Sequence, residues 1–360
     1  MTPTAHDDVD PPLFLAGPPR GVRRPVLPAA YRRLWRDQQT LQLGRASATA
    51  MVLSGLDPAT RGALALLDGT RDVAAVLRDA RLLGCADDRA LELLQVLDGA
   101  GLLDDAADVG APVRRGEQQR LAPDLASLRL VGSPVSATNR ARASVQVLGA
   151  ARVGAALATL LTAAGVERVE VVDAVATAPE DTGAAGLGRD DVGTRRDSAA
   201  VARAAALGEA AALGAGGGTD LTVLAPTTPA GLDDMAAALP VGATYLVAEV
   251  RDAVGVVGPL VVAGRSACLR CLDLHRSDRD PAWPVLAAQL SGPWRGTAAC
   301  DGTLAVAVAA QACLQALLAL DALATGGPLP ATASGTLELA LPDWRWRRRS
   351  WPLHPDCSCH

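Results

Sequence analysis

The stretch SVQVLGAARVG, residues 144–154, decides the fold of this chain. Its first five residues form an apolar strand-like run, a glycine turn follows, and a helix-forming segment begins at Arg152. A second apolar strand ends at Asp173, so the sequence predicts a strand–helix–strand unit. We therefore expect an α/β, Rossmann-like domain with a mostly parallel sheet, whose further strands lie at Leu221–Leu224, Tyr245–Val250 and Leu260–Val262.

The turn between the first strand and the helix has the residue types of a nucleotide site. Gly149 and Gly154 would let backbone amides at the helix N-terminus approach a phosphate. Asp173, at the end of the second strand, is placed to bind ribose hydroxyls. Ala151 occupies the position of the middle glycine. The turn is thus predicted either to bind ATP or to serve only the packing of helix on sheet.

Two close cysteine pairs predict a structural metal site. Cys268 and Cys271 follow the expected strand Leu260–Val262, and Cys357 and Cys359 lie near the C-terminus. Four thiolates suit tetrahedral Zn²⁺, and a shared ion would hold the C-terminal segment against the sheet domain. Two alternatives stay open: His354 or His360 replaces one thiolate, or the cysteines are reduced and carry no metal.

The rest of the chain predicts a smaller N-terminal domain. Residues 1–24 combine proline, glycine and charge and are expected to form a disordered tail. Residues 25–105 are expected to form two or three short strands followed by three short helices, which indicates a small α+β domain. Residues 106–142 are expected to be a linker that lends a helix to either neighbour, and residues 143–360 form the Rossmann-like domain.

The larger domain resembles the ThiF/MoeB/HesA family of ubiquitin-activating-like proteins. The resemblance rests on DDVGTRR, residues 190–196, and on the order of segments from 144 to 359. It implies adenylation of the C-terminus of a small ubiquitin-like carrier protein with ATP and Mg²⁺, and a homodimer. Arg196 stands where the family has a catalytic lysine, and Arg189 is the candidate for its arginine. The family's magnesium-binding aspartate is replaced by residues 225–228, APTT, which argues against catalysis.

The N-terminal domain resembles the PqqD-like, winged-helix-like domains that recognise leader peptides in ribosomal peptide maturation. The resemblance implies an extended leader bound as an added strand between residues 49–53 and helix 87–97. It rests on Trp35–Asp37, Gln42–Gly44, Leu66–Arg71 and Gly101–Leu103, and the predicted peptide contacts are Met51, Leu53, Arg89 and Leu93. The alternatives are a domain that only packs on the Rossmann-like unit and a DNA-reading winged helix, which the acids of helix 87–97 disfavour.

Composition excludes several classes of partner. All 34 basic side chains are arginine, yet the formal net charge is −5, so we expect no nucleic-acid partner. The first ten residues carry acids and no apolar run, which predicts a cytoplasmic protein. The apolar stretch 304–324 contains two glutamines and an aspartate and is expected to be a buried helix, not a membrane span. The basic run 345–349 fits an exposed strand face.

Two hypotheses follow from the two resemblances. In the first, the protein binds a precursor leader peptide and presents the peptide to a separate YcaO-like cyclodehydratase, as in azoline peptide maturation. In the second, it is an active ATP-dependent adenylyltransferase that activates the C-terminus of a ubiquitin-like carrier.

Overall fold

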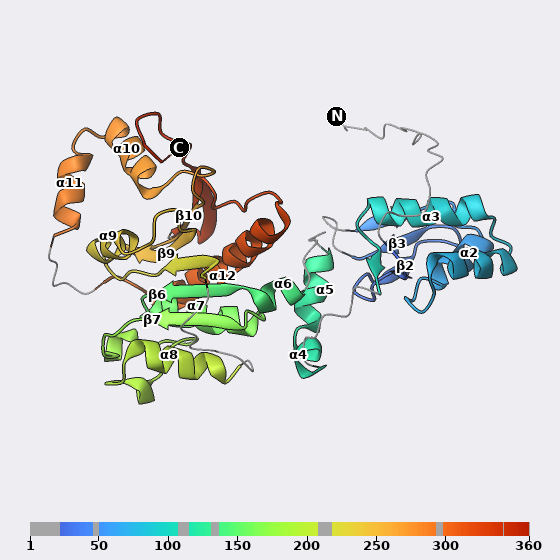
Figure 1. Cartoon of the computed structure of the whole chain (residues 1–360), viewed down its shortest axis with the longest axis horizontal. Coiled ribbons are helices and arrows are strands. Elements are labelled where there is room, and N and C mark those ends of the chain that lie inside the picture. Colours follow the sequence, from blue (N-terminus) through green and yellow to red (C-terminus); the bar gives the residue numbers. More distant parts are fainter. Residues whose placement is uncertain are drawn as a thin grey trace. The chain divides into compact units, whose positions relative to one another are not determined.

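The computed structural model describes residues 22–45, 50–106, 115–130, 137–207, 218–292, 298–340 and 342–359 (Figure 1). Most of the predicted tail 1–24 lies outside these ranges. The chain divides into two compact units: the smaller is formed by 1–112 with 122–134, and the larger by 113–121 with 135–360. Each unit has its own hydrophobic core, so each is described separately.

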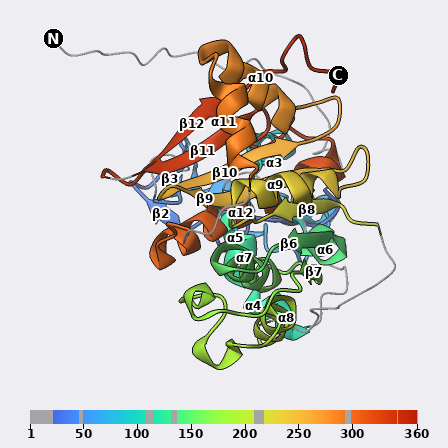
Figure 2. The ribbon, with the colours of Figure 1, turned by 90° about the vertical axis from the view of Figure 1, so that its left-hand side faces the viewer.

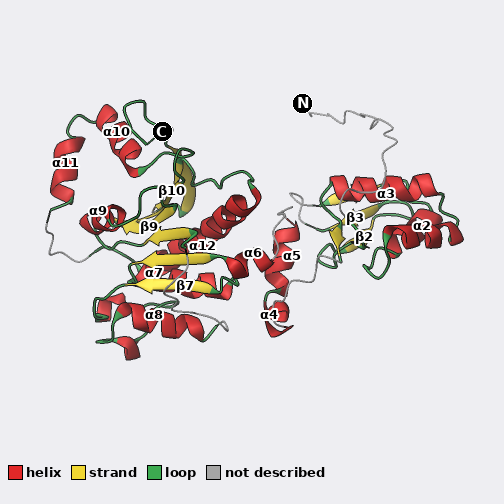
Figure 3. Ribbon diagram, in the orientation of Figure 1, coloured by secondary structure: helices red, strands yellow, loops and turns green. Residues whose placement is uncertain are grey.

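A seven-stranded sheet in the order β12-β11-β10-β9-β8-β6-β7 forms the centre of the larger unit (Figure 3). Strands β7, β6, β8 and β9 pair in parallel, as predicted, and β10, β11 and β12 continue the sheet in antiparallel pairing. β11 and β12 form a C-terminal hairpin, and the basic run 345–349 lies on the exposed strand β12, as predicted. The strands span Ser144–Leu148 (β6), Arg168–Val172 (β7), Leu221–Leu224 (β8), Tyr245–Arg251 (β9), Val254–Val261 (β10), Gly335–Ala340 (β11) and Arg345–Ser350 (β12).

The expected strand at Leu260–Val262 is the end of the longer strand β10, and it runs antiparallel to its neighbour. The reason is a two-residue turn at Asp252 and Ala253, both of which have positive φ, at 50° and 62°. Such a turn reverses the chain within a hairpin and leaves no room for the crossover that a parallel strand needs.

The helices of the larger unit pack mainly through apolar contacts. α12 lies against α7 and against β9 and β10, and α8 lies against α7 and β7. α12 is long and apolar enough to cross a membrane, but 61% of its most apolar window is buried, as predicted for a core helix. The helices span Arg115–Arg120 (α4), Ala137–Arg142 (α6), Arg152–Ala163 (α7), Arg196–Ala205 (α8), Pro229–Ala237 (α9), Leu269–Arg279 (α10), Trp283–Leu290 (α11) and Gly302–Thr325 (α12).

The smaller unit combines a three-stranded antiparallel sheet, in the order β2-β3-β4, with helices over a leucine core. A short pairing of β1 with β5 brings the two ends of the predicted range 25–105 side by side. This is the α+β content that the sequence predicts, and a winged-helix arrangement stays a prediction. The elements span Pro25–Val26 (β1), Arg33–Trp35 (β2), Leu41–Leu43 (β3), Met51–Leu53 (β4), Pro58–Ala65 (α1), Val73–Leu82 (α2), Asp87–Gly99 (α3), Asp104–Asp105 (β5) and Ala122–Leu130 (α5).

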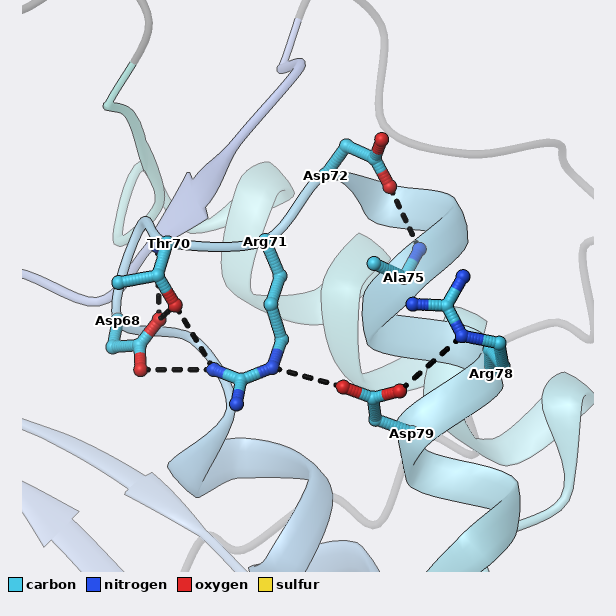
Figure 4. Close-up of polar contacts among 7 residues, drawn as sticks. All are labelled: Asp68, Thr70, Arg71, Asp72, Ala75, Arg78 and Asp79. Carbon is cyan, nitrogen blue, oxygen red and sulfur yellow. Dashed lines mark hydrogen bonds and ion pairs between the residues drawn. The ribbon is translucent and has the colours of Figure 1, made fainter.

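A polar cluster fixes the turn before α2 (Figure 4). The Arg71 guanidinium donates to Asp68 and to Asp79, both at 3.0 Å, and Asp72 caps α2 by accepting from the Ala75 amide at 2.7 Å. These side chains are partly exposed, so solvent screens the ion pairs and each contributes little to stability. The motif at Leu66–Arg71 therefore has a local structural role.

The range 106–142, predicted as a linker, contains α4, α5 and α6. Within the larger unit, the Arg120 guanidinium donates to the Ala163 carbonyl at the end of α7. Arg140 of α6 forms a buried ion pair with Asp321 of α12 at 3.4 Å. The sequence predicted a linker that lends one helix to either neighbour, and the described part of this range contains three helices.

Candidate nucleotide crevice and metal centre

The predicted nucleotide residues meet at the carboxyl ends of β6, β7 and β8. β6 lies between β7 and β8, so the sheet order reverses there, which is where ligands bind in open α/β sheets. A cavity of about 180 Å³ opens at this point. It is lined by Gly149, Val172, Asp173, Val175, Arg196, Ala225, Thr227 and Met235.

Both glycines of the turn are required by packing. Gly149 has a φ of +88°, and a Cβ there would lie 2.4 Å from the Ala225 carbonyl oxygen and 3.0 Å from Met235 Cε. A Cβ on Gly154 would lie 1.8 Å from the Gly149 carbonyl oxygen. The packing of α7 and α9 thus explains both glycines without a bound phosphate.

Asp173 and Arg196 come together, but they neutralise each other inside the protein. Arg196 lies between two carboxylates, at 3.5 Å from Asp173 and 2.8 Å from Asp181. Asp173 also accepts hydrogen bonds from the Ala150 and Val175 amides at 2.8 and 3.1 Å. These three side chains are between 7% and 15% exposed, so Arg196 is not a free cation for a triphosphate.

The start of α7 offers amides without side-chain acceptors. Its N-cap is Ala151, which is 7% exposed and has no side chain to cap the helix. The amides of a first helical turn have no intrahelical acceptors, so they attract an anion. The neighbouring Arg152 is used within the protein, because it donates to the Glu180 and Cys300 carbonyls, both at 2.6 Å.

Unlike Arg196, Arg189 is available to contact a ligand. It lies on a 3-10 turn at Arg189–Asp191, it is exposed, and its side chain makes no hydrogen bond or ion pair with the described residues. The segment after β8 offers no carboxylate: Ala225 and Pro226 are buried, and Thr228 caps α9 by accepting from the Gly231 amide. Of the described residues that line the cavity, only Asp173 carries a carboxylate.

The four predicted cysteines converge. Cys268 Sγ lies 3.6 Å from Cys357 Sγ and 3.9 Å from Cys271 Sγ, and Cys271 Sγ lies 3.5 Å from Cys359 Sγ. Sulfurs bound to one tetrahedral zinc at about 2.3 Å would lie about 3.8 Å apart, whereas a disulfide requires about 2.05 Å. Cys271 and Cys357 are buried beside Trp351. The cluster could therefore hold a metal ion, and its spacing fits Zn²⁺.

Deprotonation of all four cysteines would require a bound cation. Burial and the neighbouring sulfurs raise the pKa of Cys359 to about 12, so four thiolates would not coexist there alone. A divalent metal removes this penalty because it favours the deprotonated sulfur.

The alternative ligand His354 is engaged elsewhere. Its Nε2 lies 2.9 Å from Asp278, its Nδ1 accepts from the Asp356 amide at 3.1 Å, and its own amide points to Cys271 Sγ at 3.5 Å. It therefore supports the cysteine cluster from outside. His360 lies outside the described residues.

The predicted peptide contacts occupy different environments in the smaller unit. Leu53 and Leu93 are each 7% exposed and belong to the core of the smaller unit. Met51 is half-buried. Arg89 donates to the Gly55 carbonyl at 2.8 Å and pairs with Glu92, so it fastens the start of α3 beside the end of β4. Thr49 lies outside the described residues.

Asp181 was not among the predicted site residues. This carboxylate accepts from Arg196 and from the Ala178 amide at 2.8 Å, and it holds together the loop between β7 and α8. Its only sequence signal is APED at 178–181, which is typical of a capped turn.

Comparison with solved structures identifies the fold. The structure of E. coli MccB with succinimide matches with a TM-score of 0.69 and 13% identity, over 93% of this chain and 98% of that chain. The structure of E. coli MccB with ATP matches with a TM-score of 0.68 and 12% identity, over 93% of this chain and 99% of that chain. The chain has a ThiF-like fold. A structure of selenomethionine PaaA matches this ThiF-like chain with a TM-score of 0.64 and 16% identity, over 90% and 99%.

The other comparisons find no relative. No protein-family description matches the sequence, and no curated protein matches it. Because 93% of this chain is aligned with MccB, the likeness is not confined to the larger unit.

Proposed function

We propose that this protein captures a ribosomally made precursor peptide on its smaller unit and presents it to a separate YcaO-like cyclodehydratase, with the ThiF-like unit as a scaffold. The scaffold role is supported by the ion pairs in the crevice. Arg196 pairs with Asp173 and Asp181, so these charges are neutralised within the protein. A triphosphate would have to replace these ion pairs. The cavity of about 180 Å³ is also smaller than the roughly 300 Å³ at the low end of small-molecule sites.

A peptide partner is supported by the solved relatives and by the sheet edge of the smaller unit. E. coli MccB has been solved with MccA, and the microcin C7 biosynthetic enzyme MccB with N-formylated MccA. Among the described strands β4 pairs only with β3, so it forms an edge of its sheet, and its residue Val52 is 43% exposed. A leader peptide bound as an added strand would gain main-chain hydrogen bonds there, while Arg89 keeps α3 alongside.

Val52→Asp is expected to weaken binding of a precursor by about tenfold or more, because a carboxylate would replace an apolar contact at the β4 edge. Val52 is chosen over Met51 because its exposure leaves the core intact. The probe is a fluorescent copy of a precursor encoded beside this protein's gene, and the readout is anisotropy. Val241→Asp, at a fully exposed residue of the larger unit, is the matched control. Equal affinities for both variants and the parent would argue against the β4 site.

Adenylation is the second candidate function. It is favoured by the availability of Arg189 and by the structures of E. coli MccB with ATP and with AMPCPP. In this chain Arg189 would contact the triphosphate, Asp173 the ribose, and the amides of α7 a phosphate. Its carrier would be a ubiquitin-like protein or the C-terminus of the precursor itself.

ATP–pyrophosphate exchange separates the two candidates. With Mg²⁺ and the precursor peptide present, we expect no exchange above that of protein-free buffer, since Mg²⁺ lacks a carboxylate after β8. Calorimetry should likewise detect no ATP binding. Exchange that disappears in both Asp173→Ala and Arg189→Ala would establish the adenylyltransferase and refute the scaffold.

A further inference from the structure

Strand β12 is a charged edge that the proposed function leaves unused. It ends the seven-stranded sheet and pairs only with β11 among the described strands (Figure 2). Its sequence is RWRRRS, and every residue except Trp346 is exposed. Four arginines in six residues are unexpected in a chain with a net charge of −5.

Three of these arginines point to one side of the sheet. Arg345, Arg347 and Arg349 alternate along the strand, so they share a face. Arg349 lies 3.5 Å from Glu338 of β11 and 5.6 Å from the centre of the Trp351 ring. Arg348 faces the other side, where it donates to the Ala331 carbonyl at 2.7 Å.

Helix α10 adds positive charge to the same face. Arg276 and Arg279 lie 5.6 and 5.0 Å from the centre of the Trp351 ring, which also carries Arg349. We call Arg276, Arg279, Arg345, Arg347 and Arg349 the arginine face.

Carboxylates balance only part of this charge. Asp273, Asp343 and Glu338 pair with Arg276, Arg347 and Arg349, respectively. Arg279 and Arg345 have no carboxylate partner among the described residues. Arg347 and Arg349 keep 72% and 54% of their side chains exposed despite their pairs, so the face retains an accessible positive charge.

The backbone of β12 offers a second kind of contact. Alternate residues of an edge strand direct their N–H and C=O groups away from the sheet. Charges at every second residue of an added strand would repeat about every 6.8 Å, the same spacing as the arginines. We propose that β12 binds an extended peptide segment with acidic residues at alternate positions, which adds a strand to the sheet and pairs its carboxylates with the arginine face. This site is independent of the peptide site on the smaller unit.

The competing explanation is that the arginines only protect the edge from self-association, as charged edge residues often do. The test uses the full-length protein and a fluorescent octapeptide of alternating glutamate and threonine. A peptide with four glutamates followed by four threonines has the same composition and charge, so it isolates the effect of spacing. Anisotropy gives both affinities, and thermal unfolding shows that each variant is folded.

The alternating peptide should bind at least about tenfold more tightly than the block peptide, since charge-assisted hydrogen bonds need matched positions. The triple variant Arg345→Gln, Arg347→Gln, Arg349→Gln should lose this binding by about tenfold or more, whereas Arg348→Gln should stay within about twofold. Equal binding of the two peptides, or a triple variant that binds normally, would overturn the proposal. The proposal would also be overturned if the parent binds neither peptide and the triple variant associates with itself, since the arginines would then only protect the edge.

Discussion

Cys271→Ser is expected to abolish zinc binding and to open the C-terminal closure. The parent should contain about one zinc per chain when purified under reducing conditions, and the variant close to none, because three thiolates cannot complete the tetrahedral site. Binding of structural zinc contributes directly to folding, and loss of about 3 kcal/mol here would lower the unfolding midpoint by roughly 10 °C. Metal analysis and calorimetric melting measure the two effects.

Cys300→Ser is the matched control, because Cys300 lies outside the cluster and is half-buried. It should keep its zinc and melt close to the parent. A chelator added to the parent should reproduce the melting of Cys271→Ser. If the parent carries no metal and the Cys271 variant is as stable as the Cys300 variant, the cysteines are unliganded thiols.

Arg196→Ala is expected to destabilise the larger unit by about 3–5 kcal/mol, because it leaves Asp173 and Asp181 as buried charges without their partner. Denaturant unfolding, followed by a probe in the larger unit such as Trp351, measures the change.

The neighbouring residue provides the comparison. Arg195 pairs with Asp197 at 2.6 Å, but its side chain is 61% exposed and solvent screens the pair, so Arg195→Ala should destabilise the unit much less than Arg196→Ala. If both variants lose the same small amount, Arg196 is not a structural cation, and a role on a ligand becomes the better explanation.

The parts of the fold that depend on the local spacing of apolar residues and glycines could be predicted from the sequence. The strand at 144–148, the turn at Gly149 and the helix after it repeat a short pattern whose periods are set by backbone geometry. The cysteine pairs were equally readable, because each pair lies within four residues and only their meeting is a long-range event.

Other parts depended on contacts that no local pattern records. Asp181 lies in the loop before α8, and Arg196, 15 residues later, begins α8, so their ion pair follows from tertiary packing alone. Leu93, which was predicted as a peptide contact, is 7% exposed and packs in the core of the smaller unit, and this burial also follows from tertiary packing. The direction of β10 depended on two residues, Asp252 and Ala253, whose left-handed conformation their identities do not specify.

The glycines of the turn after β6 have an evolutionary consequence. Since Gly149 and Gly154 make room for Ala225, Met235 and each other, a lineage that lost nucleotide binding would still be selected to keep both. The two glycines are therefore expected to be retained even where nucleotide binding has been lost. Among proteins of this architecture, enzymes should be told apart from their non-catalytic descendants by the residues after β8 and by whether the cation at the start of α8 is free or paired.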